Sequence, residues 1–172
     1  MRRSAITPGM QFVVPLRPRG FAILVVAKYA ARARILVGYC FGPARRTLPT
    51  QMTQVKPRDT CLIGQISDGG IVSGEWQLLG GVPNFDRDDW PAERFQRSDD
   101  LGRWFIETYD DDDPNELISS VRTSADQVVD LPRNTLHDPW TLASELSTLL
   151  AAKELLWDRG CHDHRCAVLD EE

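Results

Sequence analysis

Residues 11–41 read QFVVPLRPRGFAILVVAKYAARARILVGYCF, and this stretch decides the fold. It contains three apolar pieces, 11–16, 21–29 and 34–41, which are separated by short basic connectors. Apolar residues alternate with other residues in the first and third pieces, and this is the period of a β-strand. Three successive strands with short turns predict an antiparallel meander, and strong bending would close it toward a small barrel.

Shorter apolar pieces at 61–66, 75–79 and 103–109 predict further strands, with glycine-rich turns around the first two. The intervening segment 42–60 is rich in Pro, Thr, Gln and Arg and has no periodicity. That composition predicts a long exposed loop.

One helix is clear in the second half, over residues 138–158. Asp138 supplies an N-cap, Pro139 is the first helical residue, and Gly160 marks the stop. A stripe of apolar residues at helical spacing predicts core packing, and its members are Leu142, Leu146, Leu149, Leu150, Leu156 and Trp157.

These elements predict a single α+β domain over residues 1–172. We expect a strongly bent antiparallel sheet over 10–110, or a small Src-homology-3-like partial barrel, with the C-terminal helix packed on it. The residues expected to be buried are Phe12, Val14, Val25, Val37, Trp76, Leu146 and Leu149.

The connector 113–136 is ambiguous, and 159–172 is expected to form a loose tail. Asp113-Pro114-Asn115-Glu116 resembles a helix start, with Pro at the first helical position and Glu at the third. The β-branched residues that follow would equally suit a strand.

Charge divides the chain into two unlike halves. Residues 1–80 carry 11 Lys and Arg against 3 Asp and Glu, whereas residues 81–172 carry 9 against 22. Such asymmetry favours electrostatic binding of a partner, although the two halves could also complement each other within the fold. The longest apolar run is far too short to span a bilayer, and no signal peptide is visible, so we expect a cytoplasmic protein.

Residues that could perform catalysis are scarce. The three histidines have no Cys or Ser partner in a known motif context, and no phosphate-cradling glycine loop is present. One cluster has side chains that zinc could use as ligands, namely Cys161, His162, His164 and Cys166. The spacing of these residues does not match a known zinc site. The sequence therefore predicts a protein that is not an enzyme and that holds neither a metal nor a cofactor.

Residues 84–97 are the most unusual segment, because Phe85, Trp90 and Phe95 are interleaved with acids and arginines. A spacing of five residues suits neither helix nor strand, so the segment should be looped or extended. The aromatic rings either pack into the core and hold the loop against it, or are exposed for contact with a partner. Both interpretations stay open for Trp90.

Several stretches of this chain resemble the immunity protein 26 family of bacterial polymorphic toxin systems. The resemblance covers about residues 6–123 and is carried by 7–16 (TPGMQFVVPL), 20–22 (GFA), 35–39 (ILVGY), 76–80 (WQLLG) and 83–91 (PNFDRDDWP). It implies a cytoplasmic antitoxin without catalysis of its own, which binds a cognate toxin domain and blocks it. A nuclease toxin is the first candidate, because an acidic surface would mask a basic substrate groove.

The expected partner-binding residues form an acidic surface centred on an exposed tryptophan. They are Asp86, Asp88, Asp89, Trp90, Asp110, Asp111, Asp112 and Asp113.

Nucleic-acid binding by the basic half is the alternative function. It would use arginines and lysines in the predicted turns, with Phe21 or Tyr29 stacking on bases. The chain as a whole is acidic and contains no recognised nucleic-acid-binding motif, so nucleic acid is the less favoured partner.

Overall fold

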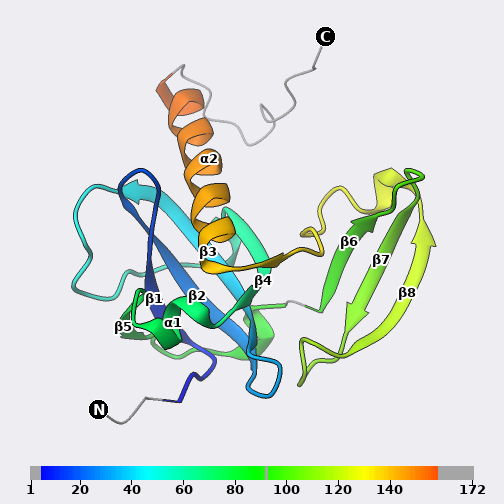
Figure 1. Cartoon of the computed structure of the whole chain (residues 1–172), viewed down its shortest axis with the longest axis horizontal. Helices are drawn as coiled ribbons and strands as arrows, with labels where there is room; N and C mark the ends of the chain where they lie inside the picture. Colours follow the sequence, from blue (N-terminus) through cyan, green and yellow to red (C-terminus); the bar gives the residue numbers. More distant parts are fainter. Residues whose placement is uncertain (1–4, 92, 159–172) are drawn as a thin grey trace.

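A computed structural model describes residues 5–91 and 93–158 of the chain, with side chains described up to residue 152. Its larger sheet has six strands, and the chain forms it first (Figure 1). In spatial order these strands are β5 (Gln77–Gly81), β1 (Met10–Pro15), β2 (Phe21–Ala30), β3 (Ile35–Arg45), β4 (Leu62–Ser67) and β9 (Leu136–His137). The predicted meander is confirmed, because β1, β2, β3 and β4 pair in sequence order and antiparallel.

The strands of the meander are apolar on both faces because both faces of the sheet are covered. One face packs against α2 (Pro139–Asp158), whose Leu142, Leu146 and Leu150 join the core beneath it. Asp138 starts this helix as expected, because its carboxylate accepts a hydrogen bond from the Thr141 backbone N–H at 2.8 Å.

Six of the seven residues expected to be buried are buried, and Leu149 is the exception. Leu149 is only partly covered, and Leu150 fills the core in its place. The difference follows from helix geometry, since Leu142, Leu146 and Leu150 are spaced by four residues and share one face.

The opposite face of the sheet carries a second core layer. Val13, Val25 and Val37 point into it, and Trp90 and Phe95 from a later part of the chain close it. This layer joins the six-stranded sheet to the rest of the molecule.

A second, three-stranded sheet lies beside the first, on the right of Figure 1. It consists of β6 (Arg94–Ser98), β7 (Trp104–Tyr109) and β8 (Leu117–Thr123), all antiparallel. The expectation of one bent sheet or partial barrel over 10–110 is therefore wrong, and the described residues form no closed barrel. The larger sheet also contains one short parallel pair, between β4 and β9.

The ambiguous connector is a strand rather than a helix over its first half. β8 pairs with β7, and the short 3₁₀-helix Ala125–Gln127 and β9 follow it. The helix-start pattern at Asp113 fails because Asp113 closes a local turn, accepting from the Asn115 backbone N–H at 2.9 Å.

The predicted loop 42–60 starts later than expected, since β3 runs to Arg45. Its middle is anchored by Gln11, a buried amide that donates to the Thr53 carbonyl (2.9 Å) and accepts from the Thr53 N–H (2.7 Å). A short 3₁₀-helix, Pro57–Asp59, precedes β4, and the five-residue α1 (Gly69–Ser73) follows it. Among the described helices, none has the length and apolar character needed to cross a membrane.

Candidate functional site

The turn at residues 86–90 carries the first group of expected site residues. Asp86 caps the 3₁₀-helix Arg87–Asp89, because its carboxylate accepts from the Asp88 N–H at 3.1 Å. The side chains of Asp86, Asp88 and Asp89 are exposed, as expected for a binding surface.

Trp90 is not exposed, so the expectation of an exposed tryptophan at the centre of the surface is wrong. Its side chain is 3% exposed and lies edge-on to Tyr39, with ring centroids 5.1 Å apart, and is stacked with Phe85 at 5.6 Å. A large ring gains most by burial, and here the second core layer offers it an aromatic environment. Trp90 staples the turn to the sheet, as Phe95 does further along the chain.

The turn at residues 110–113 carries the second group, and these aspartates order their own backbone. The Asp110 carboxylate accepts from the N–H groups of Asp112 (2.8 Å) and Asp113 (2.9 Å). Asp111 and Asp112 are exposed, whereas Asp110 and Asp113 are partly covered. Two of the four aspartates in this turn are therefore open to solvent.

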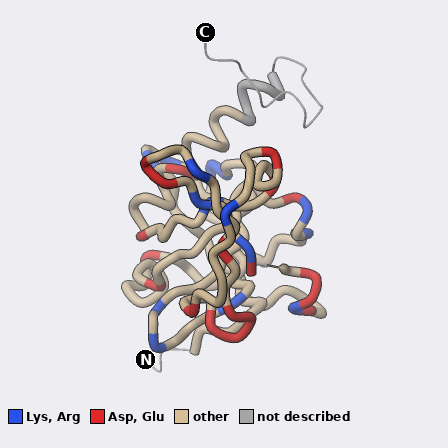
Figure 2. The backbone as a smooth tube through the Cα atoms, turned by 90° about the vertical axis from the view of Figure 1, so that its right-hand side faces the viewer, with Lys and Arg blue, Asp and Glu red and all other residues tan. Residues whose placement is uncertain are grey.

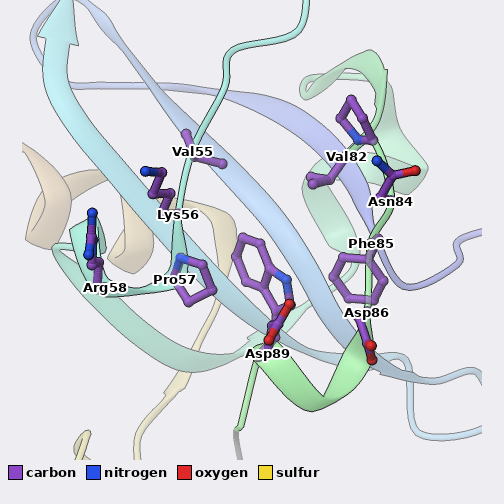
Figure 3. Close-up of a pocket in the computed structure, with 11 residues that line it drawn as sticks. Val55, Lys56, Pro57, Arg58, Val82, Asn84, Phe85, Asp86 and Asp89 are labelled. Carbon is purple, nitrogen blue, oxygen red and sulfur yellow. The ribbon is translucent and has the colours of Figure 1, made fainter.

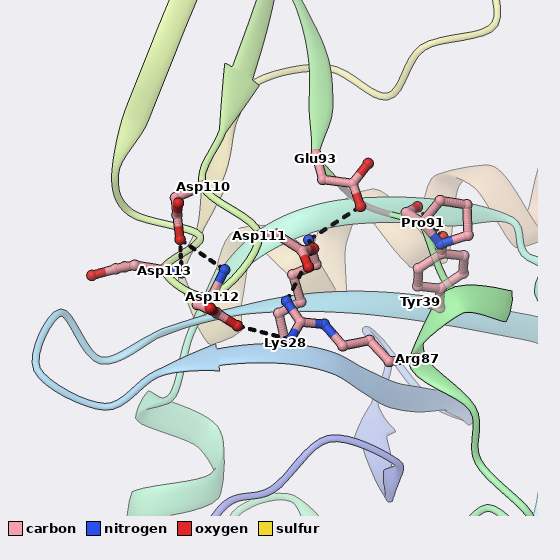
Figure 4. A network of polar contacts seen from close by, with 9 residues as sticks. All are labelled: Lys28, Tyr39, Arg87, Pro91, Glu93, Asp110, Asp111, Asp112 and Asp113. Atoms are coloured by element: carbon pink, nitrogen blue, oxygen red, sulfur yellow. Dashed lines mark hydrogen bonds and ion pairs between the residues drawn. The ribbon is translucent and has the colours of Figure 1, made fainter.

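Two cations bring the two turns together (Figure 4). Lys28, near the end of β2 and only 3% exposed, contacts Asp111 at 2.5 Å and Glu93 at 3.4 Å. Arg87 lies 3.0 Å from both Asp111 and Asp112. The hydrogen bond from Lys28, and then that from Arg87, lowers the pKa of Asp111. Residues 86–89 and 110–113 thus form one surface, which we call the acidic surface.

The acids of this surface differ in what they pair with. Asp111 and Asp112 are held by internal cations, but within the described residues no cation lies at ion-pair distance from Asp86, Asp88 or Asp89. Seven aspartates surround two cations, so the surface keeps a negative net charge. The exposed acids of the 86–89 turn therefore have no cation beside them within the described residues.

An open hollow of about 470 Å³ lies next to the 86–90 turn (Figure 3). Phe85 and Trp90 contribute aromatic surface to it, and Asp86 and Asp89 stand at its rim. The loop 55–58 forms the opposite wall. A second hollow of about 420 Å³ shares Pro57, Arg58 and Asp89 with the first. Asp86 and Asp89 therefore border a concave, partly apolar surface.

Lys28 and Arg87 were missed as site residues by the sequence analysis. A single lysine within an otherwise apolar strand is the available signal for Lys28, since a buried ammonium requires an acidic partner. Nothing in the sequence indicates that this partner is Asp111, because 83 residues separate the two.

The two unlike halves do not neutralise each other broadly. Among the described ion pairs, Lys28 is the only cation of residues 1–80 that contacts acids of residues 81–172. Figure 2 shows acidic stretches in several separate places on the side of the molecule that carries the smaller sheet, with basic stretches between them.

The basic half is partly engaged within the fold. Arg34 pairs with the buried Asp68 at 2.9 Å, and Arg17 lies over the Trp140 ring at 3.6 Å. Tyr29, a proposed base-stacking residue, donates its hydroxyl to Asp68 at 2.9 Å. Phe21 packs against the second core layer. Neither aromatic ring is presented as a free stacking platform.

Potential metal and catalytic groups are few in the part of the chain that the structure describes. No group of three or more His, Cys, Asp or Glu side chains there could hold a metal ion. His137 is buried, its Nδ1 lies 3.3 Å from Glu145, and burial lowers its pKa. The segment with Cys161, His162, His164 and Cys166 lies outside the described residues.

Comparisons of the chain with family models, with curated proteins and with solved structures found no match in any of the three.

Proposed function

We propose that this chain is a non-catalytic immunity protein that binds a cognate toxin domain and covers a basic surface of that domain. The observation that carries the proposal is the acidic surface, in which Asp86, Asp88 and Asp89 are exposed and have no described cation beside them. The 86–89 turn is therefore the part that a cationic partner would contact first.

Charge and shape act together at this position. Unpaired carboxylates on one turn steer a basic partner and align it before contact, which raises the rate of association. The adjoining hollow, with Phe85 and Trp90 in its lining, then offers apolar surface for a partner side chain. A nuclease toxin is the first candidate, because its substrate groove must carry cations to bind phosphates.

Trp90 has a supporting role in this proposal. Buried contacts with Tyr39 and Phe85 fix the turn, so the acids that follow Phe85 are held in one arrangement. A rigid contact loop loses less conformational entropy when it binds.

We infer that His137 does not act as a general base. A general base must reach its substrate, yet this imidazole is buried beside Glu145 and under α2. We interpret the contact between His137 and Glu145 as a link between β9 and α2.

A toxin domain encoded beside this chain's own reading frame would be the partner to test. Asp88→Lys combined with Asp89→Lys should weaken binding by about tenfold or more and remove protection of cells that express the toxin. The matched control is Asp100→Lys combined with Asp126→Lys, two exposed acids without a described ion-pair partner elsewhere on the molecule. The control should bind and protect like the wild type.

Equal neutralisation by both double variants would contradict the role of the acidic surface. Absence of any binding between the wild-type chain and the toxin domain would contradict the immunity function itself.

Nucleic-acid binding is the rival function. The salt dependence of binding to DNA or RNA distinguishes it from the immunity function. A chain that binds DNA or RNA loses affinity steeply as salt rises, in proportion to the phosphates it contacts. We expect the purified chain to show no binding to either nucleic acid at low salt. Binding that is lost on replacing the exposed Arg32, Arg46 and Arg58 would favour the rival.

A further inference from the structure

The outer edge of β8 is the one long sheet edge that the described residues leave open. β6 is protected, because its Gln96 N–H donates to the Pro132 carbonyl and its Gln96 carbonyl accepts from the Asn134 N–H, both at 2.7 Å. β9 has two residues, and β5 has five, of which two are glycines. β8 has seven residues and pairs only with β7. Figure 1 shows it as the outermost strand of the smaller sheet.

This edge is apolar as well as open. Leu117 is 48% exposed, Ile118 62% and Val121 59%, so three large apolar side chains reach solvent within five residues. Proteins usually protect an open edge with a proline, a lysine or another charge, and β8 contains no proline or lysine and a single charge, Arg122, near its end. An unprotected strand of this kind pairs readily with another strand.

The charges at the two ends of β8 indicate which strand could pair with its open edge. Glu116 precedes β8 and Arg122 lies near its other end, both exposed. Within the described residues neither side chain has an ion-pair partner. If β8 meets a second β8 in antiparallel orientation, the Glu116 end of each copy lies beside the Arg122 end of the other. A parallel arrangement would set like charges together, which is unfavourable.

We propose that the chain forms a two-fold symmetric dimer in which β8 pairs antiparallel with β8 of a second copy. The two three-stranded sheets then join into one sheet of six strands. Main-chain hydrogen bonds then satisfy both open edges. The inference is independent of the proposed function, because no residue of β8 belongs to the acidic surface.

Sedimentation equilibrium over a concentration series tests the dimer. The wild-type chain should shift from monomer to dimer mass as its concentration rises, and Val121→Lys should stay monomeric at every concentration. Leu101→Lys is the matched control, an exposed apolar residue in the β6–β7 turn, and it should dimerise like the wild type. Unchanged melting temperatures will show that both variants are folded.

A charge exchange tests the antiparallel orientation. Glu116→Arg and Arg122→Glu should each raise the dimer dissociation constant by about tenfold, because each sets two like charges together at both symmetric positions. The double variant Glu116→Arg with Arg122→Glu restores opposite charges and should recover wild-type dimerisation.

Three results from the sedimentation experiments would overturn the proposal. They are a wild-type chain that stays monomeric at all concentrations, a dimer that tolerates Val121→Lys, and a double variant that dimerises more weakly than either single variant. The amide protons of β8 that point away from β7 should become protected as the concentration rises. Equal protection of these amides at all concentrations would also overturn the proposal, because the strand would then be covered by its own chain.

Discussion

Asp88 and Asp111 are both exposed aspartates in tight turns of one surface, but their surroundings differ. Asp111 is contacted by the buried ammonium of Lys28 and lies 3.0 Å from the Arg87 guanidinium. Asp88 has no cation at ion-pair distance within the described residues. One turn stabilises the fold, whereas the other has its charge available for a partner.

This difference shows that a run of acids in a sequence does not by itself define a binding surface. Four consecutive aspartates, Asp110 to Asp113, are the stronger signal in the sequence, yet they cap their own turn and neutralise Lys28 and Arg87. The shorter run at 86–89 keeps its charges unpaired because its only basic residue, Arg87, turns toward the other run.

The largest expected effect is a loss of stability when Trp90, which holds the 86–90 turn on the sheet, is replaced. Trp90→Ala should lower the free energy of unfolding by about 3–5 kcal/mol, because it removes a buried ring from the second core layer. Trp140→Ala is the control, since that ring is 59% exposed, and it should cost about 1 kcal/mol or less. Urea unfolding measures both. Similar losses for the two tryptophans would contradict the stapling role of Trp90.

The next effect distinguishes the two turns directly. Asp111→Asn should cost about 2 kcal/mol, because it leaves the buried Lys28 with Glu93 alone, and the exposure of Asp111 keeps the loss moderate. Asp88→Asn should change stability by less than about 0.5 kcal/mol, as for an ordinary surface substitution. If the two substitutions cost the same, the distinction between the turns is wrong.

The smallest effect is a pH dependence. Since Lys28 and Arg87 lower the pKa of Asp111 in the folded protein, its ionisation stabilises the fold above the unfolded-state pKa of about 3.9. That stabilisation is lost as pH falls through the lower folded-state pKa. The stability difference between wild type and Asp111→Asn should therefore be full at neutral pH and shrink in strong acid. A difference that stays constant down to the lowest pH would count against this ion pair.

Much of the fold follows from local pattern. The strands at 11–16, 21–29 and 34–41 were predictable because apolar periodicity and turn residues are local, and the helix start at Asp138 was predictable from its cap. The smaller sheet was not predictable as a separate unit, because its place depends on Phe95 and Trp90 reaching the far face of the larger sheet.

The two acidic turns were predictable from the sequence, but the different contacts that their aspartates make were not. The sequence indicates that residues 86–89 and 110–113 carry charge, and the structure brings them side by side through Arg87. Which acids are paired depends on Lys28, a contact across 83 residues that no local pattern contains. The burial of Trp90 also depends on contacts between residues far apart in the sequence, since its neighbours Tyr39 and Phe41 lie on β3.

The rate of association with the proposed toxin domain tests the central claim most directly. Stopped-flow mixing should show a wild-type rate that falls steeply as salt rises, because unpaired carboxylates steer the encounter. Asp88→Lys with Asp89→Lys should associate about tenfold more slowly at low salt and lose most of the salt dependence, while Asp100→Lys with Asp126→Lys keeps the wild-type rate. A wild-type rate and salt dependence in the Asp88 and Asp89 variant would contradict the claim that this turn receives the partner.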